Sequence, residues 1–284
     1  MKIGVSSYSF KKYIIQNKCD YIEVCNQAKE LGFEGIEFIE LDSKAFGITE
    51  DAKKTAKEIN LHCKKIGLEI IAYTIGADFL TGDGEDTIKK VCDAIDVAEI
   101  LGAPVLRHDV CYSMPADHLF SYRDAIKIMA PRIRRVTEYA KSKGIKTCTE
   151  NHGYIFQHPE RVEELILAVG SDNYGWLCDI GNFLCADVDP VKATAIAAPY
   201  AFHSHVKDFL FKPGALECPT GFFMTLGGNY IRGTAVGHGV VPVRNCISAL
   251  KRAGYDSWIS VEFEGMEENI PALKAGIEFL SKIV

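Results

Sequence analysis

The chain has 284 residues, of which 48% are hydrophobic and 25% are charged, and its formal net charge at pH 7 is −6. This composition is typical of a globular protein and excludes disordered and collagen-like chains. The excess of acidic residues disfavours a protein that binds nucleic acid through a basic face. No stretch reaches the roughly 18 apolar residues that a membrane-spanning helix needs.

The residues from Met1 to Tyr8 lack the apolar segment and the cleavage site of a secretory signal, so we expect a cytoplasmic protein. Ten cysteines are spread along the chain without a C-x-x-C pair. In such a chain we expect them to be reduced and mostly buried rather than joined in disulfides.

A short pattern recurs along the chain: a helical stretch, a glycine, and then an apolar run that ends in a polar residue. The five glycines of this pattern are Gly32, Gly67, Gly102, Gly144 and Gly254. Glycine directly after a helix favours the left-handed conformation that ends it. The pattern therefore predicts helices that lead into strands, and repeated units of this kind build a parallel sheet.

The pattern predicts eight strands and eight helices. The strands are expected near residues 2–6, 35–39, 69–74, 104–108, 145–150, 175–179, 202–207 and 258–262. The helices are expected near residues 20–31, 51–66, 86–101, 121–143, 159–169, 189–197, 243–253 and 269–283. Eight parallel strands that alternate with helices predict an α/β fold, a (β/α)8 TIM barrel, as one domain over residues 1–284. The longest stretch without periodicity, residues 208–242, is expected to be a functional loop insertion.

Ionisable residues lie at the ends of four consecutive predicted strands, where a buried barrel strand would otherwise be apolar. They are Glu150, Asp179, His205 and Glu262. Functional residues of TIM barrels lie at these carboxyl ends. Three carboxylates and an imidazole suit a divalent cation such as Mn²⁺, Mg²⁺ or Co²⁺, and without one the carboxylates would repel one another. The pattern therefore predicts a metal site at the barrel mouth.

Several phrases of the sequence are similar to the xylose isomerase-like barrel superfamily, and above all to its sugar phosphate isomerase/epimerase group, which includes ketose 3-epimerases and inosose dehydratase. The phrases are ENHG (150–153), DIGN (179–182), HVKD (205–208), GHGVV (237–241) and ISVE (259–262), with IGVS (3–6) and GIE (35–37) nearer the start. Their order and their placement on predicted strands extend the resemblance over almost the whole chain.

The resemblance implies one divalent metal held by Glu150, Asp179, His205 and Glu262. It also implies that Glu150 and Glu262 are acid/base partners on either side of a substrate. They would remove and return a proton beside a carbonyl, through an enediolate, without an organic cofactor. Mn is the expected metal, with Mg, Co, Fe or Zn as alternatives. The implied activity is isomerisation or epimerisation of a sugar or a sugar phosphate.

Two positions depart from the pattern of the ketose epimerases. Asn182 stands where they carry a histidine, and Phe156 stands where they carry a glutamate. Both positions contact or tune the reacting hydroxyl groups. The departures therefore concern the substrate and leave the metal set intact.

The expected substrate-binding residues surround the metal set. They are His108, His152, Asn182, Lys207 and Arg232. Strand alternation points His152 and Lys207 the same way as Glu150 and His205, and the resemblance implies a role for Arg232. Arg107 and His108 are neighbours at the end of one strand, so only one of them can face the barrel mouth. We favour His108.

Three further residues near the predicted site have more than one interpretation. Glu37 either supports the metal site or forms a structural ion pair. Glu264 is either a second carboxylate near the site or a helix cap. His203 lies one layer below His205 and is expected to be a core histidine.

Other activities remain open beside the isomerase. A lyase or dehydratase could use the same enediolate to expel a leaving group from a keto-sugar, a keto-polyol or an oxidised glycoside. An apurinic endonuclease would need more metal ligands and a basic groove, and a non-catalytic sugar-binding barrel would not need the two glutamates. The expected partner is a small carbohydrate, without nucleic acid or membrane, and the aromatic residues of 208–242 leave a homo-oligomer open.

Overall fold

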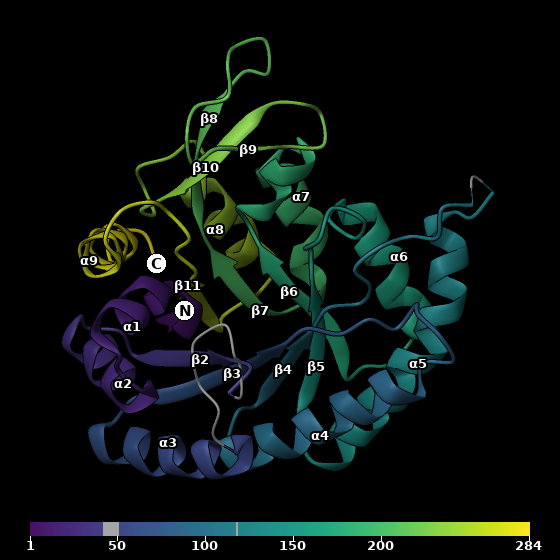
Figure 1. The fold of residues 1–284 in the computed structure, drawn as a ribbon, viewed down its shortest axis with the longest axis horizontal. Helices are drawn as coiled ribbons and strands as arrows, with labels where there is room; N and C mark the ends of the chain where they lie inside the picture. Colours follow the sequence, from purple (N-terminus) through teal and green to yellow (C-terminus); the bar gives the residue numbers. More distant parts are fainter. Residues whose placement is uncertain (42–50, 118) are drawn as a thin grey trace.

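The computed structural model describes residues 1–41, 51–117 and 119–284. In these residues eight parallel strands form a closed barrel in the order β1-β11-β7-β6-β5-β4-β3-β2 (Figure 1). The strands are β1 (Lys2–Ser6), β2 (Gly35–Ile39), β3 (Glu69–Ile75), β4 (Val105–His108), β5 (Lys146–Glu150), β6 (Tyr174–Asp179), β7 (Ala201–Val206) and β11 (Trp258–Val261). The predicted TIM barrel is confirmed, and each strand starts and ends within one residue of its expected bounds.

Helices cover the outside of the barrel (Figure 1). They are α1 (Lys11–Asn17), α2 (Tyr21–Glu30), α3 (Ala52–Ile66), α4 (Glu85–Leu101), α5 (Tyr122–Ser142), α6 (Pro159–Val169), α7 (Pro190–Ala197), α8 (Val243–Arg252) and α9 (Asn269–Leu280). The sequence pattern does not predict α1, because this seven-residue helix buries only Ile14 and so lacks an apolar periodicity. No described helix is both long enough and apolar enough to cross a membrane.

Two glycines illustrate how the recurring pattern ends its helices. Gly67 has a φ of 65° and its N–H donates to the carbonyl of Cys63. Gly102 has a φ of 81° and its N–H donates to the carbonyl of Ala98. Both therefore adopt the left-handed conformation expected from the sequence, in which other residues are strained.

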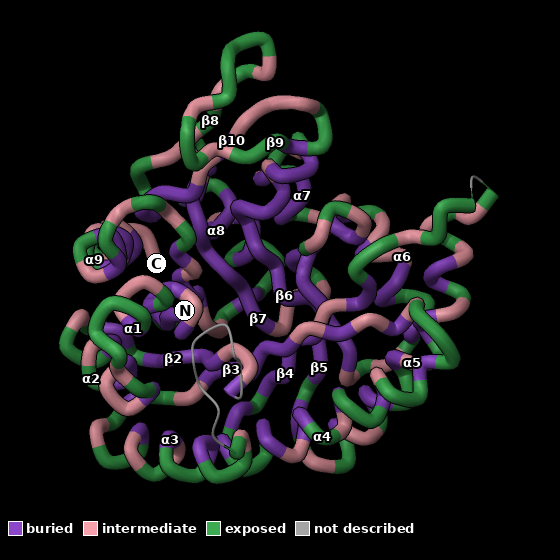
Figure 2. Tube along the Cα trace, in the orientation of Figure 1, coloured by how far each residue is buried: buried purple, intermediate pink, exposed green. Residues whose placement is uncertain are grey.

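The apolar core lies mainly between the barrel and its helices, so the strands are buried along most of their length (Figure 2). A smaller apolar cluster fills the inside of the barrel and contains Ala72, Val105, Cys148 and Leu177. Three charged residues follow members of this cluster by two positions on the same strands: Arg107 follows Val105, Glu150 follows Cys148, and Asp179 follows Leu177. Because alternate residues of a strand share a face, these charged side chains lie inside the barrel above an apolar floor.

The stretch predicted as a loop insertion, 208–242, contains a small antiparallel sheet in the order β8-β10-β9, which projects beyond the barrel (Figure 1). Its strands are β8 (Asp208–Lys212), β9 (Phe223–Met224) and β10 (Tyr230–Thr234). Connections rich in glycine and proline separate the three strands in sequence, and the strands pair across them. The stretch as a whole therefore shows little periodicity. The prediction of a loop is corrected on this point.

Asp208 anchors the end of this stretch to its beginning. Its buried carboxylate accepts hydrogen bonds from the backbone N–H groups of Gly237 and Gly239, both at 2.9 Å, and of Val241, at 3.0 Å. A fourth bond comes from Phe209 at 2.9 Å. One side chain therefore holds the segment that leads from β10 to α8.

The cysteines follow the sequence-based expectation. All ten are free thiols, and seven of them are buried.

Candidate metal centre

Four side chains predicted as metal ligands converge at the carboxyl ends of four neighbouring strands. The possible ligand atoms of Glu150, Asp179, His205 and Glu262 all lie within 4.8 Å of one another. Nδ1 of His205 lies 3.8 Å from both Oε1 of Glu150 and Oδ2 of Asp179. The same atom lies 3.5 Å from Oε2 of Glu262. The barrel thus brings together residues that are up to 112 positions apart, from Glu150 to Glu262.

The chemistry of this group fits a divalent cation. Nδ1 of His205 and Oδ2 of Asp179 are buried and form no hydrogen bond, although Nζ of Lys207 lies 3.2 Å from Oδ2. Burial, together with the negative charge of the neighbouring Glu150, raises the pKa of Asp179 to about 7 against the opposing charge of Lys207. A cation among these side chains would offset the repulsion between the carboxylates and give both buried atoms a partner.

Glu37 links the two histidines of β7. Its Oε2 lies 2.6 Å from Nε2 of His203, and its Oε1 lies 2.5 Å from Nε2 of His205. These are hydrogen-bond distances, shorter than the roughly 3 Å that two ligand atoms keep around one ion. Glu37 therefore orients His205 so that Nδ1 faces the metal centre, which is the supporting role weighed from the sequence.

Arg107 enters the site, although the sequence analysis favoured its neighbour His108. Its Nη2 lies 2.8 Å from Oε2 of Glu150 and 2.7 Å from Oδ1 of Asp109. Asn182 donates from Nδ2 to the other oxygen of Glu150 at 2.8 Å. Burial favours the neutral form of Glu150, but the charges of Arg107 and His205 outweigh it and hold the pKa of this carboxyl well below its ordinary value.

His108 points away from the barrel mouth. The expectation that it faces the mouth and contacts the substrate is therefore wrong. Its ring is fully buried beside Phe79 and Tyr174, with ring centres 5.1 and 5.8 Å away. Alternation within β4 gave no sequence signal for Arg107, because Val105 and Leu106 are both apolar and either one could face inward. Val105 faces the apolar floor inside the barrel, so the residue two positions later shares its face.

Lys207 and His152 lie beside the metal centre, as expected from the sequence. Nζ of the buried Lys207 is 2.5 Å from Oε2 of Glu262 and 3.2 Å from Oδ2 of Asp179. Nδ1 of His152 is 3.0 Å from Oδ1 of Asp109, and half of this side chain is exposed. Asp109 thus joins Arg107 and His152, a contact that the sequence analysis missed.

The structure does not bring Arg232 into this group. It lies on β10, where its guanidinium stands over the ring of Phe222 and Nη2 is 3.9 Å from Oε1 of Glu267. Glu264 does approach the site, since its Oε1 is 3.8 Å from Nζ of Lys207. Of the two roles weighed for Glu264, the structure therefore supports a second carboxylate. Phe156 is buried.

A pocket of about 240 Å³ opens above the metal centre. Its ionisable lining residues are Tyr8, Glu40, Arg107, Glu150, His152, Lys207, Glu262 and Glu264, and Ile39, Thr74, Ile75 and Gly76 complete the lining. The pocket thus gives a small molecule access to two of the three ligand carboxylates, Glu150 and Glu262.

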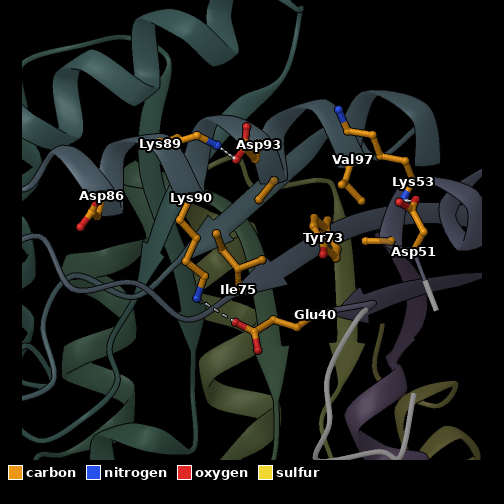
Figure 3. A pocket seen from close by; sticks show the side chains of 12 residues that line it. Glu40, Asp51, Lys53, Tyr73, Ile75, Asp86, Lys89, Lys90, Asp93 and Val97 are labelled. Carbon is orange, nitrogen blue, oxygen red and sulfur yellow. Dashed lines mark hydrogen bonds and ion pairs between the residues drawn. The ribbon is translucent and has the colours of Figure 1, made fainter. Parts of the chain in front are cut away.

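A larger hollow of about 680 Å³ lies outside the barrel mouth, beside β3, α3 and α4 (Figure 3). Two of its lysines pair with acidic side chains of the same hollow: Lys89 with Asp93, and Lys90 with Glu40. No group of metal-ligating residues in the described part of the chain lies there. The pocket above the metal centre is therefore the better candidate for chemistry.

Comparison with known proteins agrees with this architecture. The sequence model of the xylose isomerase-like TIM barrel family matches residues 25–283. No curated protein matches the chain in sequence.

Solved structures of low sequence identity share the fold over nearly the whole chain. The probable 3-DHS dehydratase AsbF from Bacillus anthracis is 23% identical, with 99% of each chain covered and a TM-score of 0.76. The IOLI protein with a bound zinc atom is 16% identical, with 100% of this chain and 98% of that chain covered and a TM-score of 0.76. D-psicose 3-epimerase from Clostridium cellulolyticum H10 is 15% identical, with 100% and 99% covered and a TM-score of 0.73. With its family match over most of the sequence and its closed eight-stranded barrel, the chain belongs to the xylose isomerase-like TIM barrel family.

Proposed function

We propose that this protein is a divalent-metal-dependent enzyme that isomerises or epimerises a sugar or a sugar phosphate. The observation that carries the proposal is the arrangement of Glu150 and Glu262, which line one pocket and approach the same atom, Nδ1 of His205, at 3.8 and 3.5 Å. Two carboxylates that line the same pocket can remove a proton from a substrate and return it.

Glu150, Asp179, His205 and Glu262 would hold the metal. A bound divalent cation polarises a carbonyl group and stabilises the negative charge that develops when a neighbouring C–H proton is removed. Mn is our expectation, with Mg, Co, Fe or Zn as alternatives, and the similar IOLI protein contains zinc.

Side chains of the protein would carry out the proton transfers and bind the substrate. Glu150 or Glu262 takes the proton from the carbon beside the carbonyl, which leaves an enediolate, and a carboxyl group returns a proton to give the product. Lys207 holds Glu262 in place at 2.5 Å and contributes a positive charge beside the developing oxyanion. We expect His152 and Asn182 to hydrogen-bond substrate hydroxyl groups. His152 lines the pocket and lies 3.0 Å from Asp109, and Asn182 donates to Glu150 at 2.8 Å.

A dehydratase is the second candidate, and two observations favour it. Asn182 and Phe156 replace residues of the ketose epimerase pattern, and AsbF, the structural relative with 23% identity, is a probable dehydratase. After the same proton removal, the C–O bond at the β carbon would break. The leaving hydroxide would take a proton from a nearby acid, such as His152, and depart as water. Product analysis separates an isomer or epimer from a dehydrated product.

The first test is elemental analysis of the purified protein after metal reconstitution. We expect about one divalent metal per chain in the wild type and in the surface control Glu278→Ala, and a loss of at least tenfold in metal affinity in both Glu150→Ala and His205→Ala. Glu262→Gln should keep the fold, and its catalytic rate should fall at least 100-fold because the proton acceptor is lost. A protein that binds no metal after reconstitution would contradict the proposal, and three zinc ions per chain would favour an endonuclease.

A further inference from the structure

We propose that the substrate of this pocket is an uncharged polyhydroxy ketone and not a phosphate ester or a carboxylic acid. The inference rests on the proposed function and narrows its substrate class. Two independent features of the structure support it. First, the cationic side chains of the pocket are already paired with carboxylates of the chain. Second, backbone N–H groups in the region where many TIM barrels bind phosphate already donate to a carboxylate of the chain.

Among the residues that the structure describes, the cationic side chains that line the pocket all contact carboxylates of the chain. Arg107 lies within 2.8 Å of both Asp109 and Glu150. Lys207 lies within 3.2 Å of Asp179 and Glu262, and His152 lies 3.0 Å from Asp109. Arg107 and Lys207 are also buried, so neither can swing toward a ligand without leaving a carboxylate unpaired in a low-dielectric environment.

The cations at the rim add little. Lys90 turns toward Glu40, with Nζ 3.3 Å from Oε1, and also donates to the carbonyl of Gly76 at 2.8 Å (Figure 3). Lys11 is exposed outside the lining residues, with Nζ 5.8 Å from the ring centre of Tyr8. An exposed lysine in solvent binds a phosphate only weakly, because water screens its charge.

Carboxylates outnumber cations around the pocket. Among the described residues the carboxylates are Glu40, Asp109, Glu150, Asp179, Glu262 and Glu264, and the permanent cations are Lys90, Arg107 and Lys207. With six negative and three positive formal charges, the pocket would keep a net charge of −1 even after it had bound a divalent ion. A phosphate dianion would therefore be repelled, whereas hydroxyl groups can donate hydrogen bonds to the carboxylate oxygens.

The second feature lies between β7 and β11, the seventh and eighth strands of the barrel along the chain. TIM barrels frequently bind phosphate through the loops after these strands, where backbone N–H groups converge. In this chain three such groups, those of Gly237, Gly239 and Val241, donate to the carboxylate of Asp208 at 2.9, 2.9 and 3.0 Å. Because the Asp208 carboxylate is buried and accepts from all three N–H groups, these groups are not free to bind a phosphate.

The test compares matched ligands on the Mg²⁺-reconstituted full chain. The probes are D-fructose, D-tagatose and D-xylulose, their terminal phosphates, and the ketouronates of the two hexuloses. Binding is measured by isothermal titration calorimetry. Exchange of the C–H proton beside the carbonyl for deuterium is measured by proton NMR in D₂O. We expect at least one neutral ketose to bind and to exchange, and each anionic counterpart to do both at least tenfold less well.

A charge-reversal variant tests the physical reason. Glu264→Lys changes the balance inside the pocket, and Glu278→Lys makes the same change on the exposed face of α9. Only Glu264→Lys should improve the binding of the phosphate relative to the neutral ketose, by at least tenfold. Equal effects of the two variants would overturn the electrostatic argument.

The remaining outcomes separate this inference from the proposed function. Faster exchange or tighter binding of a phosphate or a ketouronate than of its neutral partner would overturn the inference and leave the proposed function standing. Preferential binding of neutral ketoses without any exchange would support the substrate class and contradict the proposed reaction. If no probe binds or exchanges, both are overturned.

Discussion

Arg107 and Glu150 face each other inside the barrel, with Nη2 of the arginine 2.8 Å from Oε2 of the glutamate, and both side chains are buried. The guanidinium occupies one oxygen of the carboxylate, so the other oxygen is left on the side of His205. The ion pair thus fixes both the charge and the orientation of a proposed metal ligand.

The first prediction concerns this ion pair. Arg107→Met should weaken divalent metal binding by about 10- to 100-fold, because Glu150 loses the charge that favours its ionised form and the contact that orients it. Arg107→Lys should keep part of the affinity. Calorimetric titration with Mn²⁺ measures both, and Arg123→Met, which breaks an exposed ion pair with Glu164, is the control. Wild-type affinity in Arg107→Met would show that the pair does not act on the metal.

The second prediction concerns Glu37, whose carboxylate oxygens lie 2.6 Å from Nε2 of His203 and 2.5 Å from Nε2 of His205. Glu37→Ala should lower the free energy of unfolding by about 3–5 kcal/mol, since it leaves buried polar groups without a partner. Glu37→Gln keeps an acceptor oxygen and should cost less, yet it should still weaken metal binding about 10-fold. Urea unfolding of the metal-free protein gives the first quantity and metal titration the second. Equal stability of the two variants would contradict the role assigned to the acceptor oxygens.

The third prediction concerns pH and His108. Burial lowers the pKa of His108 from 6.5 to about 4. Above pH 6.5 the imidazole is neutral in the folded and the unfolded chain. Between pH 6.5 and about 4 only the unfolded chain gains the proton, so this residue should lower the free energy of unfolding by up to about 3 kcal/mol as the pH falls.

His108→Phe is the matched variant, because it keeps a ring beside Phe79 and Tyr174 and removes the titration. Unfolding in urea, measured at intervals from pH 7 to pH 4, should show a smaller loss of stability in the variant than in the wild type. Parallel pH profiles of the two proteins would refute the prediction.

The fourth prediction concerns Asp208. Asp208→Ala removes the acceptor of four backbone N–H groups, so the free energy of unfolding should fall by about 2–4 kcal/mol. Amide hydrogen exchange at Gly237, Gly239 and Val241 should accelerate more than exchange in the barrel strands. Asp208→Asn should have a smaller effect, because one acceptor oxygen remains. Unchanged exchange at the three amides would show that other contacts hold this segment.

The barrel and the four proposed ligands could be predicted because each depends on local sequence signals. Charged residues such as Glu150 and Asp179 stand at the ends of apolar strands, and the closed topology then determines that they meet. The inward face of β4 could not be predicted in this way, because Val105 and Leu106 are both apolar and alternation alone allows either phase. Arg107 faces inward toward Glu150, and His108 packs against Phe79 and Tyr174 on the other face of the strand.

The outer sheet depended on pairing between distant residues. Phe211 of β8 pairs with Ile231 of β10, across a connection that carries no periodic pattern. Local sequence therefore indicated a long insertion but not its strands. Arg232 illustrates the result: its position in the sequence suggested the substrate, whereas strand pairing directs it toward Glu267.

Lys207 is the single residue between the last residue of β7, Val206, and the first residue of β8, Asp208. Its ammonium group contacts Glu262, and its backbone joins the barrel to the outer sheet. No flexible linker separates the two sheets at this point, so a tilt of the outer sheet is transmitted to one peptide unit. A change in the orientation of the outer sheet would therefore move the backbone of Lys207, and with it the ammonium group beside Glu262.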